Sequence, residues 1–140
     1  MRRSFTQLWV HCVWATWDRT PLLVSDGERA VYVAIPAKCD DLGCEPLAIG
    51  GIADHVHLVV RIPATLAVAR LMKEVKGASS HLVTHQISSG DFFKWHGSYG
   101  ALTVGKDSVN AVKAYIERQE EHHNAVTIVA DWEQCGTNEE

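Results

Sequence analysis

The sequence predicts an α+β domain: a four-stranded antiparallel sheet with helices on one face and a final helix over the other. Strand-like segments, rich in β-branched and aromatic residues, alternate with segments whose apolar residues recur at helical spacing. Their order is strand, helix, strand, strand, helix, strand, helix. The first six elements match a ferredoxin-like split βαβ pattern, in which the first and third strands are central neighbours. A chain of 140 residues suits one such domain.

The first strand is predicted over residues 6–17, where β-branched and aromatic residues dominate. A helix follows over residues 25–41. Ser25 and Glu28 have the spacing of a capping box at its start, and Gly43 ends it. Pro36 lies inside this helix, so we expect a kink or a split there.

The second half of the pattern begins with strands over 44–52 and 55–62, which most simply form a hairpin. A helix over 65–86, a loop over 88–90 and a strand over 98–104 follow. The last helix is expected over 109–123, with Ser108 as its cap. We assign residues 1–130 to a single domain and residues 131–140 to an acidic C-terminal tail.

Composition excludes several classes of protein. Hydrophobic residues make up 46% and charged residues 21%, which is typical of a globular domain. No apolar run approaches the roughly 20 residues that a spanning helix needs, so we expect no membrane contact. The N-terminus lacks a secretory signal, which predicts a cytoplasmic protein with four reduced cysteines.

The net charge of −4 is unevenly distributed along the chain. Residues 55–113 carry seven basic and three acidic residues, whereas residues 114–140 carry one basic and seven acidic. A basic central block can still hold a phosphate backbone inside an acidic frame. Nucleic acid therefore stays open as a partner.

His55 and His57 stand two apart at the start of the third predicted strand. Side chains at positions i and i+2 of a strand point to the same face, so both imidazoles can share one metal ion. This pair alone is a weak signal and needs a third ligand.

The last predicted helix carries Tyr115 and Gln119, one turn apart on the same face. Gln119 could supply a carbonyl oxygen as third ligand, and Tyr115 could attack what the metal binds. Because these three ligands are neutral, the metal ion keeps its full positive charge. It can then act as a Lewis acid on the negatively charged oxygens of a phosphodiester. Attack by Tyr115 gives a covalent phosphotyrosine, whose reversal rejoins strands without a nucleotide cofactor.

These residues belong to a longer pattern in the chain. Its parts are His11-Cys12-Val13-Trp14, Arg19-Thr20-Pro21-Leu22, Asp54-His55-Val56-His57-Leu58, Lys76-Gly77-Ala78-Ser79-Ser80, Trp95, Ser98-Tyr99-Gly100-Ala101 and Tyr115-Ile116-Glu117-Arg118-Gln119-Glu120-Glu121-His122-His123. Over residues 4–123 the chain resembles the single-tyrosine HUH transposases of small insertion sequences, including the REP-associated tyrosine transposases.

The resemblance implies a metal-dependent single-strand DNA endonuclease and strand transferase. Tyr115 would be the nucleophile, and His55, His57 and Gln119 would hold Mg²⁺ or Mn²⁺. The product would be a 5′-phosphotyrosine with a free 3′-OH, made on single-stranded DNA with hairpin ends. Many members are homodimers, although REP-associated members can work as monomers, so the oligomer stays open.

Five further residues are weaker candidates. Lys73 and Lys76 could meet phosphates, although helix lysines are usually solvated. Trp95 and Tyr99 could stack on unpaired bases. His11 lies on the strand expected beside the third and could touch the metal site through another side chain.

Two other functions remain open from the sequence. One is a non-catalytic nucleic-acid-binding module of the same fold, and the other is a metal-dependent nuclease without a covalent intermediate. Cutting that survives Tyr115→Phe would favour the nuclease. Binding without metal or cutting would favour the module.

Overall fold

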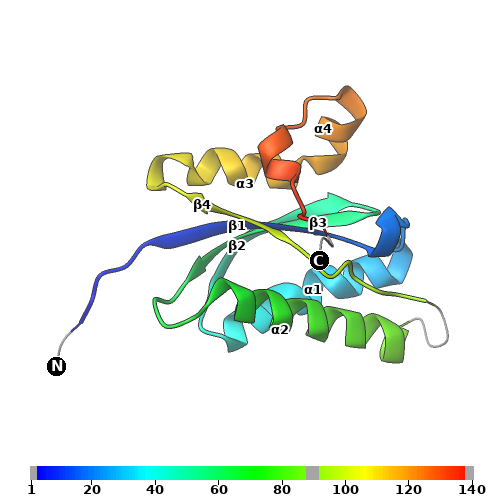
Figure 1. Cartoon of the computed structure of the whole chain (residues 1–140), viewed down its shortest axis with the longest axis horizontal. Coiled ribbons are helices and arrows are strands. Elements are labelled where there is room, and N and C mark those ends of the chain that lie inside the picture. The colour runs from blue at the N-terminus through cyan, green and yellow to red at the C-terminus, as the bar shows by residue number, and fades with distance from the viewer. Residues whose placement is uncertain (1–2, 88–91, 138–140) are drawn as a thin grey trace.

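A central antiparallel sheet separates two layers of helices (Figure 1). The computed structural model describes residues 3–87 and 92–137. The strands are β1 (Leu8–Ala15), β2 (Glu45–Ile52), β3 (His55–Ile62) and β4 (Gly100–Val104), in the order β2-β3-β1-β4. The predicted α+β fold, with the first and third strands at the centre, is therefore confirmed.

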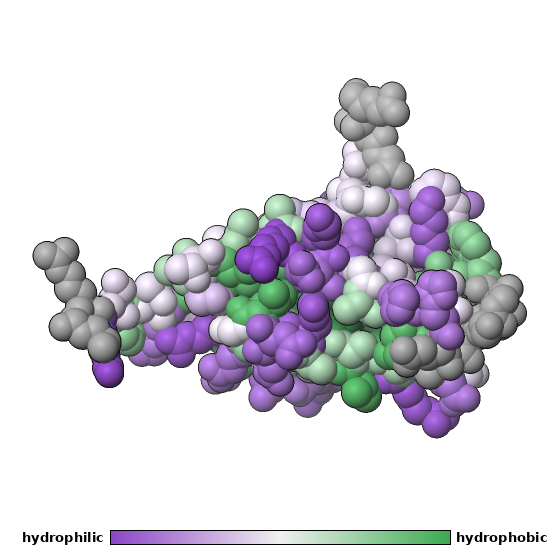
Figure 2. All heavy atoms as spheres, turned by 90° about the horizontal axis from the view of Figure 1, so that it is seen from below, coloured by the Kyte–Doolittle hydropathy of each residue, from purple (hydrophilic) through white to green (hydrophobic). Residues whose placement is uncertain are grey.

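Helices α1 (Ser25–Asp41) and α2 (Val68–Leu82) cover one face of the sheet. Residues four apart on α1, such as Val31, Ile35 and Cys39, are fully buried against it. Trp14 of β1 and Leu58 of β3 point into this layer and complete the main core. The outward side of these helices carries interspersed hydrophilic and hydrophobic side chains (Figure 2).

The opposite face is covered by α3 (Val109–Glu117), α4 (Gln119–Ala125) and a short helix η4 (Ala130–Glu133) (Figure 1). Gly50 of β2 allows α3 to come this close. A Cβ atom at Gly50 would lie 2.2 Å from the carbonyl oxygen of Ile116. Since Gly50 pairs with His57 across the β2–β3 ladder, α3 rests directly beside the histidine strand.

Several predicted boundaries need correction. The last helix breaks at Arg118, where the backbone leaves helical geometry (φ −117°, ψ 32°), so that α3 and α4 replace one helix over 109–123. No glycine or proline lies at this break. Pro36 does not split α1. Helix α2 is shorter than predicted and passes into a π-helical turn, Val83–Ile87.

Neither predicted serine cap forms. Ser25 lies inside α1 with a left-handed φ of 55°, and neither Val24, the residue at the cap position, nor Ser108 makes a side-chain capping bond. The predicted loop over 88–90 and the last three tail residues lie outside the described residues.

All four cysteines are free and buried. In the described part of the chain, no helix is long and apolar enough to cross a membrane. The boundary at residue 131 stays a prediction.

Candidate active site

His55 and His57 point to the α3 side of the sheet, and both are almost completely buried. Their positions follow from strand alternation, since Val56 and Leu58 between and after them enter the core on the other face. The two rings meet edge to face with centroids 5.0 Å apart. The predicted pairing of the two imidazoles on one face is therefore what the structure has.

Each histidine is oriented through its Nδ1 atom. The Nδ1 atom of His55 lies 2.7 Å from a carboxylate oxygen of Asp54, the turn residue before β3. The Nδ1 atom of His57 lies 2.9 Å from Nε2 of His11 on the neighbouring strand β1. When both Nδ1 atoms carry the proton, both Nε2 atoms have lone pairs free for a metal ion.

Tyr115 and Gln119 both reach the histidines, although the helix breaks between them. The Oε1 atom of Gln119 lies 3.1 Å from Nε2 of His55. The ring of Tyr115 meets that of His57 edge to face, with centroids 6.0 Å apart. The side chain of Gln119 is buried, and its Nε2 atom has no hydrogen-bond partner among the described residues. These two residues come from the same chain as the histidines that they approach.

Glu133 of η4 lies at the centre of this group, and sequence reasoning missed it. Its Oε1 atom is 3.1 Å from Nε2 of His55 and 3.1 Å from Nε2 of His57. Its Oε2 atom accepts a hydrogen bond from the Tyr115 hydroxyl. The ligand atoms of His55, His57 and Glu133 lie within 4.8 Å of one another, a spacing that could hold a metal ion.

The protonation of these groups reflects burial opposed by hydrogen bonding. Burial raises the pKa of the Glu133 carboxyl, but hydrogen bonds from His55 and His57 outweigh it and hold that pKa far below its usual range. Burial lowers the pKa of His55, but bonds with Glu133 and Asp54 outweigh it and raise that pKa overall. Burial dominates at His57 and lowers its pKa. Burial and Glu133 together raise the pKa of Tyr115.

Two histidines of α4 complete the surroundings. His122 stacks on the Tyr115 ring with centroids 4.5 Å apart. The Nε2 atom of His123 lies 3.2 Å from Oε1 of Gln119 and 3.2 Å from Oε1 of Glu133. From the sequence, His122 and His123 were assigned no role in the site. The position of His123 four residues after Gln119 was the signal that could have found it.

Of the five weaker candidates, His11 contacts His57 in the site, and the other four lie on α2 or pack against the main core on the other side of the sheet. Trp95 is buried against Trp14 and donates its indole N–H to the Ser79 hydroxyl at 3.0 Å. The ammonium group of Lys76 donates to the carbonyl oxygens of His96 and Ser98, at 2.7 and 3.3 Å. Both side chains hold the fold together, which argues against the DNA contacts that we expected of them.

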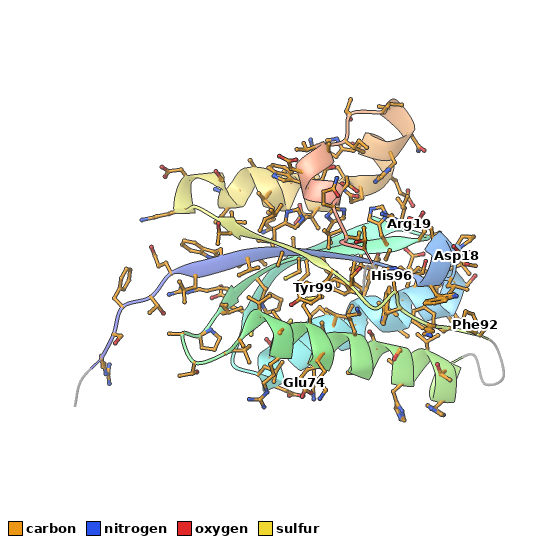
Figure 3. The ribbon with its side chains drawn as sticks, in the orientation of Figure 1. Asp18, Arg19, Glu74, Phe92, His96 and Tyr99 are labelled. Carbon is orange, nitrogen blue, oxygen red and sulfur yellow. The ribbon has the colours of Figure 1, made fainter. Side chains whose placement is uncertain are left out.

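Lys73 is exposed on α2, and Tyr99 packs half-buried against the main core. Helix α2 lies on the opposite side of the sheet from α3 (Figure 1), and Tyr99 lies on the α2 side (Figure 3). The DNA contacts of both residues stay predictions.

Known proteins resemble this chain in sequence and in fold. The family model described as IS200-like transposase (Y1_Tnp) matches residues 4–119. The chain belongs to this family. The ISDra2 transposase TnpA of Deinococcus radiodurans is 28% identical over 81% of this transposase and 84% of its own length. The IS200 transposase of Salmonella typhimurium is 30% identical over 78% and 74%, respectively.

Solved structures agree with the family. A Deinococcus radiodurans R1 protein described as a transposase superposes with a TM-score of 0.63 at 26% identity, over 85% of this transposase and 95% of that chain. A REP-associated tyrosine transposase bound to a REP hairpin shares the fold, with a TM-score of 0.67 at 18% identity over 94% and 78% of the two chains. The resemblance deduced from the sequence is thus confirmed at the level of the family.

Proposed function

We propose that this transposase cuts and rejoins single-stranded DNA through a 5′-phosphotyrosine at Tyr115, with a divalent metal ion held by His55, His57 and Gln119. The observation that carries the proposal is the convergence of a phenol, two imidazoles and an amide oxygen on one buried point. A purely structural or binding role gives no reason to bury these polar groups together.

The amide oxygen of Gln119 is a donor that Mg²⁺ and Mn²⁺ accept, and the two imidazoles favour a transition-metal ion such as Mn²⁺. The Oε1 atom of Gln119 lies 3.1 Å from the Nε2 atom of His55, which supports a role for this oxygen as a third ligand. Asp54 and His11 support the tautomer in which the Nε2 atoms are free. When bound, the cation would supply positive charge to the oxygens of a phosphodiester.

Tyr115 supplies the nucleophile in this proposal. Its phenol oxygen forms a bond to phosphorus and gives up its proton, while the bond from phosphorus to the 3′ oxygen breaks. That 3′ oxygen takes up a proton and leaves as a free 3′-OH. Since the phosphotyrosine bond is similar in kind to the bond that was broken, a second 3′-OH can reverse the step and join a new strand without a nucleotide cofactor.

The DNA partner is proposed by analogy with a relative, and the oligomeric state is proposed from the number of cuts that excision needs. The REP-associated relative was solved with a REP hairpin, and we propose that this chain also takes DNA with hairpin ends. We propose a homodimer, because one tyrosine makes one covalent cut and excision of an element needs two. Light scattering of the purified protein, with and without DNA, tests the oligomer.

A covalent-adduct assay tests the mechanism. Wild type, Tyr115→Phe and the control Tyr32→Phe are mixed with labelled single-stranded DNA from the genomic flanks, with Mn²⁺ or EDTA. We expect a metal-dependent protein–DNA band in wild type and Tyr32→Phe and none in Tyr115→Phe. Free nicked product that is equal in all three proteins would instead identify a metal-dependent nuclease. DNA binding without cutting would identify a binding module.

A further inference from the structure

His123 of α4 brings a third imidazole to the proposed metal site. Its Nε2 atom lies 3.2 Å from the Oε1 atom of Gln119, and that oxygen lies 3.1 Å from the Nε2 atom of His55. The rings of His123 and His55 meet edge to face, with centroids 4.9 Å apart. The amide oxygen of Gln119 therefore lies between one proposed ligand and a histidine to which the proposed function gives no role.

The separations between these donor atoms are those of neighbouring ligands around one cation. Two ligand atoms that each lie about 2.1 Å from a metal ion are about 3.0 Å apart at an octahedral angle and about 3.4 Å apart at a tetrahedral angle. The two separations at the Gln119 oxygen, 3.1 and 3.2 Å, fall between these values. A cation that binds His55 and Gln119 is therefore within bonding reach of His123.

Three imidazole nitrogen atoms converge on one point of the site. The Oε1 atom of Glu133 lies 3.1 Å from the Nε2 atoms of His55 and His57 and 3.2 Å from the Nε2 atom of His123. A carboxylate oxygen has two lone pairs, so it cannot accept well-directed hydrogen bonds from three ring N–H groups at once. Hydrogen bonding to Glu133 therefore does not account for all three rings, whereas ligands of one cation must converge in this way.

The other ring nitrogen of His123 leaves its Nε2 atom available as a ligand. The hydrogen bonds that the His123 side chain makes to described residues all involve Nε2, and the side chain is 25% exposed. A proton on Nδ1 can therefore be solvated by water while Nε2 keeps its lone pair. His55 and His57 are buried and need Asp54 and His11 to fix the same tautomer.

Helix α4 explains why His123, and not its neighbour, reaches the site. Gln119 begins this helix on the α3 side of the sheet, and His123 lies four residues later on the same helical face (Figure 1). His122 points elsewhere: its ring stacks on Tyr115, and its Nδ1 atom lies 2.9 Å from the Thr127 hydroxyl. Two adjacent histidines thus differ in their contacts, and His122 is a matched control for His123.

We infer that His123 is a fourth protein ligand of the divalent ion, so that the site consists of three imidazoles and one amide oxygen. The inference rests on the proposed function for the position of the ion, which His55, His57 and Gln119 define. Oxygen ligands suit Mg²⁺, whereas imidazole suits transition-metal ions. The third imidazole shifts the preference of the site away from Mg²⁺ and toward ions with a higher affinity for nitrogen, such as Co²⁺.

Titration with Co²⁺ alone, in the absence of DNA, tests the ligand. His123→Phe keeps a ring and removes the nitrogen atoms, and His122→Phe makes the same change one residue away. All proteins carry His81→Phe, because His81 and His85 stack with centroids 4.4 Å apart on the other face of the sheet and can bind Co²⁺ themselves. Circular dichroism checks that each variant is folded.

We expect His123→Phe to raise the Kd for Co²⁺ at least about tenfold, and His122→Phe to raise it less than about twofold. The Kd for Mg²⁺ should change less than about threefold in either variant, because Mg²⁺ gains little from imidazole. Equal Kd values for Co²⁺ in the two variants would overturn the inference. Wild type that binds no Co²⁺ would overturn it as well.

Chemical rescue separates a ligand from a residue that only supports the fold. His123→Ala removes the ring at a side chain that is partly open to water, so added imidazole can enter. With imidazole, we expect the Kd for Co²⁺ and the visible absorption of the bound ion to return toward those of wild type at the same imidazole concentration. His122→Ala should show no imidazole-dependent change relative to wild type. A raised Kd in His123→Ala that imidazole does not restore would assign His123 a structural role and overturn the inference.

The adduct assay separates this inference from the proposed function. A metal-dependent adduct on Tyr115, together with equal Kd values for Co²⁺ in His123→Phe and His122→Phe, would keep the proposed function and overturn the fourth ligand. A Kd for Co²⁺ that depends on His123, together with no adduct from any protein, would keep the fourth ligand and overturn the strand-transfer chemistry.

Discussion

The Nε2 atom of His11 lies 2.9 Å from the Nδ1 atom of His57, on the neighbouring strand. His11 is buried, and its own Nδ1 has no hydrogen-bond partner among the described residues. If His57 binds metal through Nε2, its Nδ1–H must donate to His11. His11, which is not one of the proposed ligands, would therefore fix the ring orientation and tautomer of one that is.

Replacing His11 should weaken metal binding. We expect His11→Phe, which removes the acceptor, to raise the Kd for Mn²⁺ at least about tenfold. His11→Gln keeps an acceptor oxygen and should lose less. Isothermal titration measures both, with His81→Phe on the exposed side of α2 as control. Equal Kd values for His11→Phe and His81→Phe would contradict the role assigned to His11.

His11 should also make the fold sensitive to acid. Burial, with a contribution from nearby His57, lowers the pKa of His11 from 6.5 to about 4. The imidazole of His11 therefore binds a proton below about pH 6.5 in the unfolded chain, but only below about pH 4 in the folded chain. The free energy of unfolding falls as the pH drops through this window.

Between pH 7 and pH 5 this difference in proton binding lowers the free energy of unfolding by about 2 kcal/mol. We expect His11→Gln, which does not titrate, to lose that much less stability than wild type over the same range. Urea unfolding at the two pH values measures it. An identical loss in both proteins would show that His11 does not carry the effect.

The sequence was sufficient to predict the sheet and to bring the four main candidate residues together, because local periodicity carries most of both predictions. Strand alternation brought His55 and His57 to one face. Helical spacing predicted that Tyr115 and Gln119 lie together, and both reach the histidines although the helix breaks at Arg118 between them. Glu133 was beyond such reasoning. It lies in a short helix after an exposed turn at Val126, and only tertiary contacts bring it to the histidines. Trp95 is buried, and the burial of an aromatic side chain is not visible in its local sequence.

Gly50 should be intolerant of a side chain. We expect Gly50→Ala to cost more than about 2 kcal/mol, because the added Cβ meets the Ile116 backbone and would push α3 from the sheet. Gly77→Ala is the control, since nothing lies within 4 Å of a Cβ there. On an exposed helix it should stabilise by up to about 1 kcal/mol. Urea unfolding measures both, and equal effects would contradict the close packing of α3.

Trp95 should matter for stability and not for DNA. Ser79→Ala leaves the buried indole N–H of Trp95 without its acceptor and should cost about 1–3 kcal/mol. Ser80→Ala, which loses only an exposed 3.3 Å bond to Gly77, should change stability by less than about 0.5 kcal/mol. Thermal unfolding gives the stabilities, and fluorescence anisotropy gives the Kd for single-stranded DNA. A weaker DNA affinity in folded Ser79→Ala would restore Trp95 as a contact candidate.

The central claim is that Tyr115 is the nucleophile, and peptide mapping tests it most directly. Protein is reacted with single-stranded DNA from its flanks and Mn²⁺, then digested with nuclease and protease. The account predicts a nucleotide attached through its 5′ phosphate to the peptide that contains Tyr115, and to no peptide when EDTA replaces Mn²⁺. A nucleotide on Tyr32, Tyr99 or another side chain, or cut DNA with no modified peptide, would contradict it.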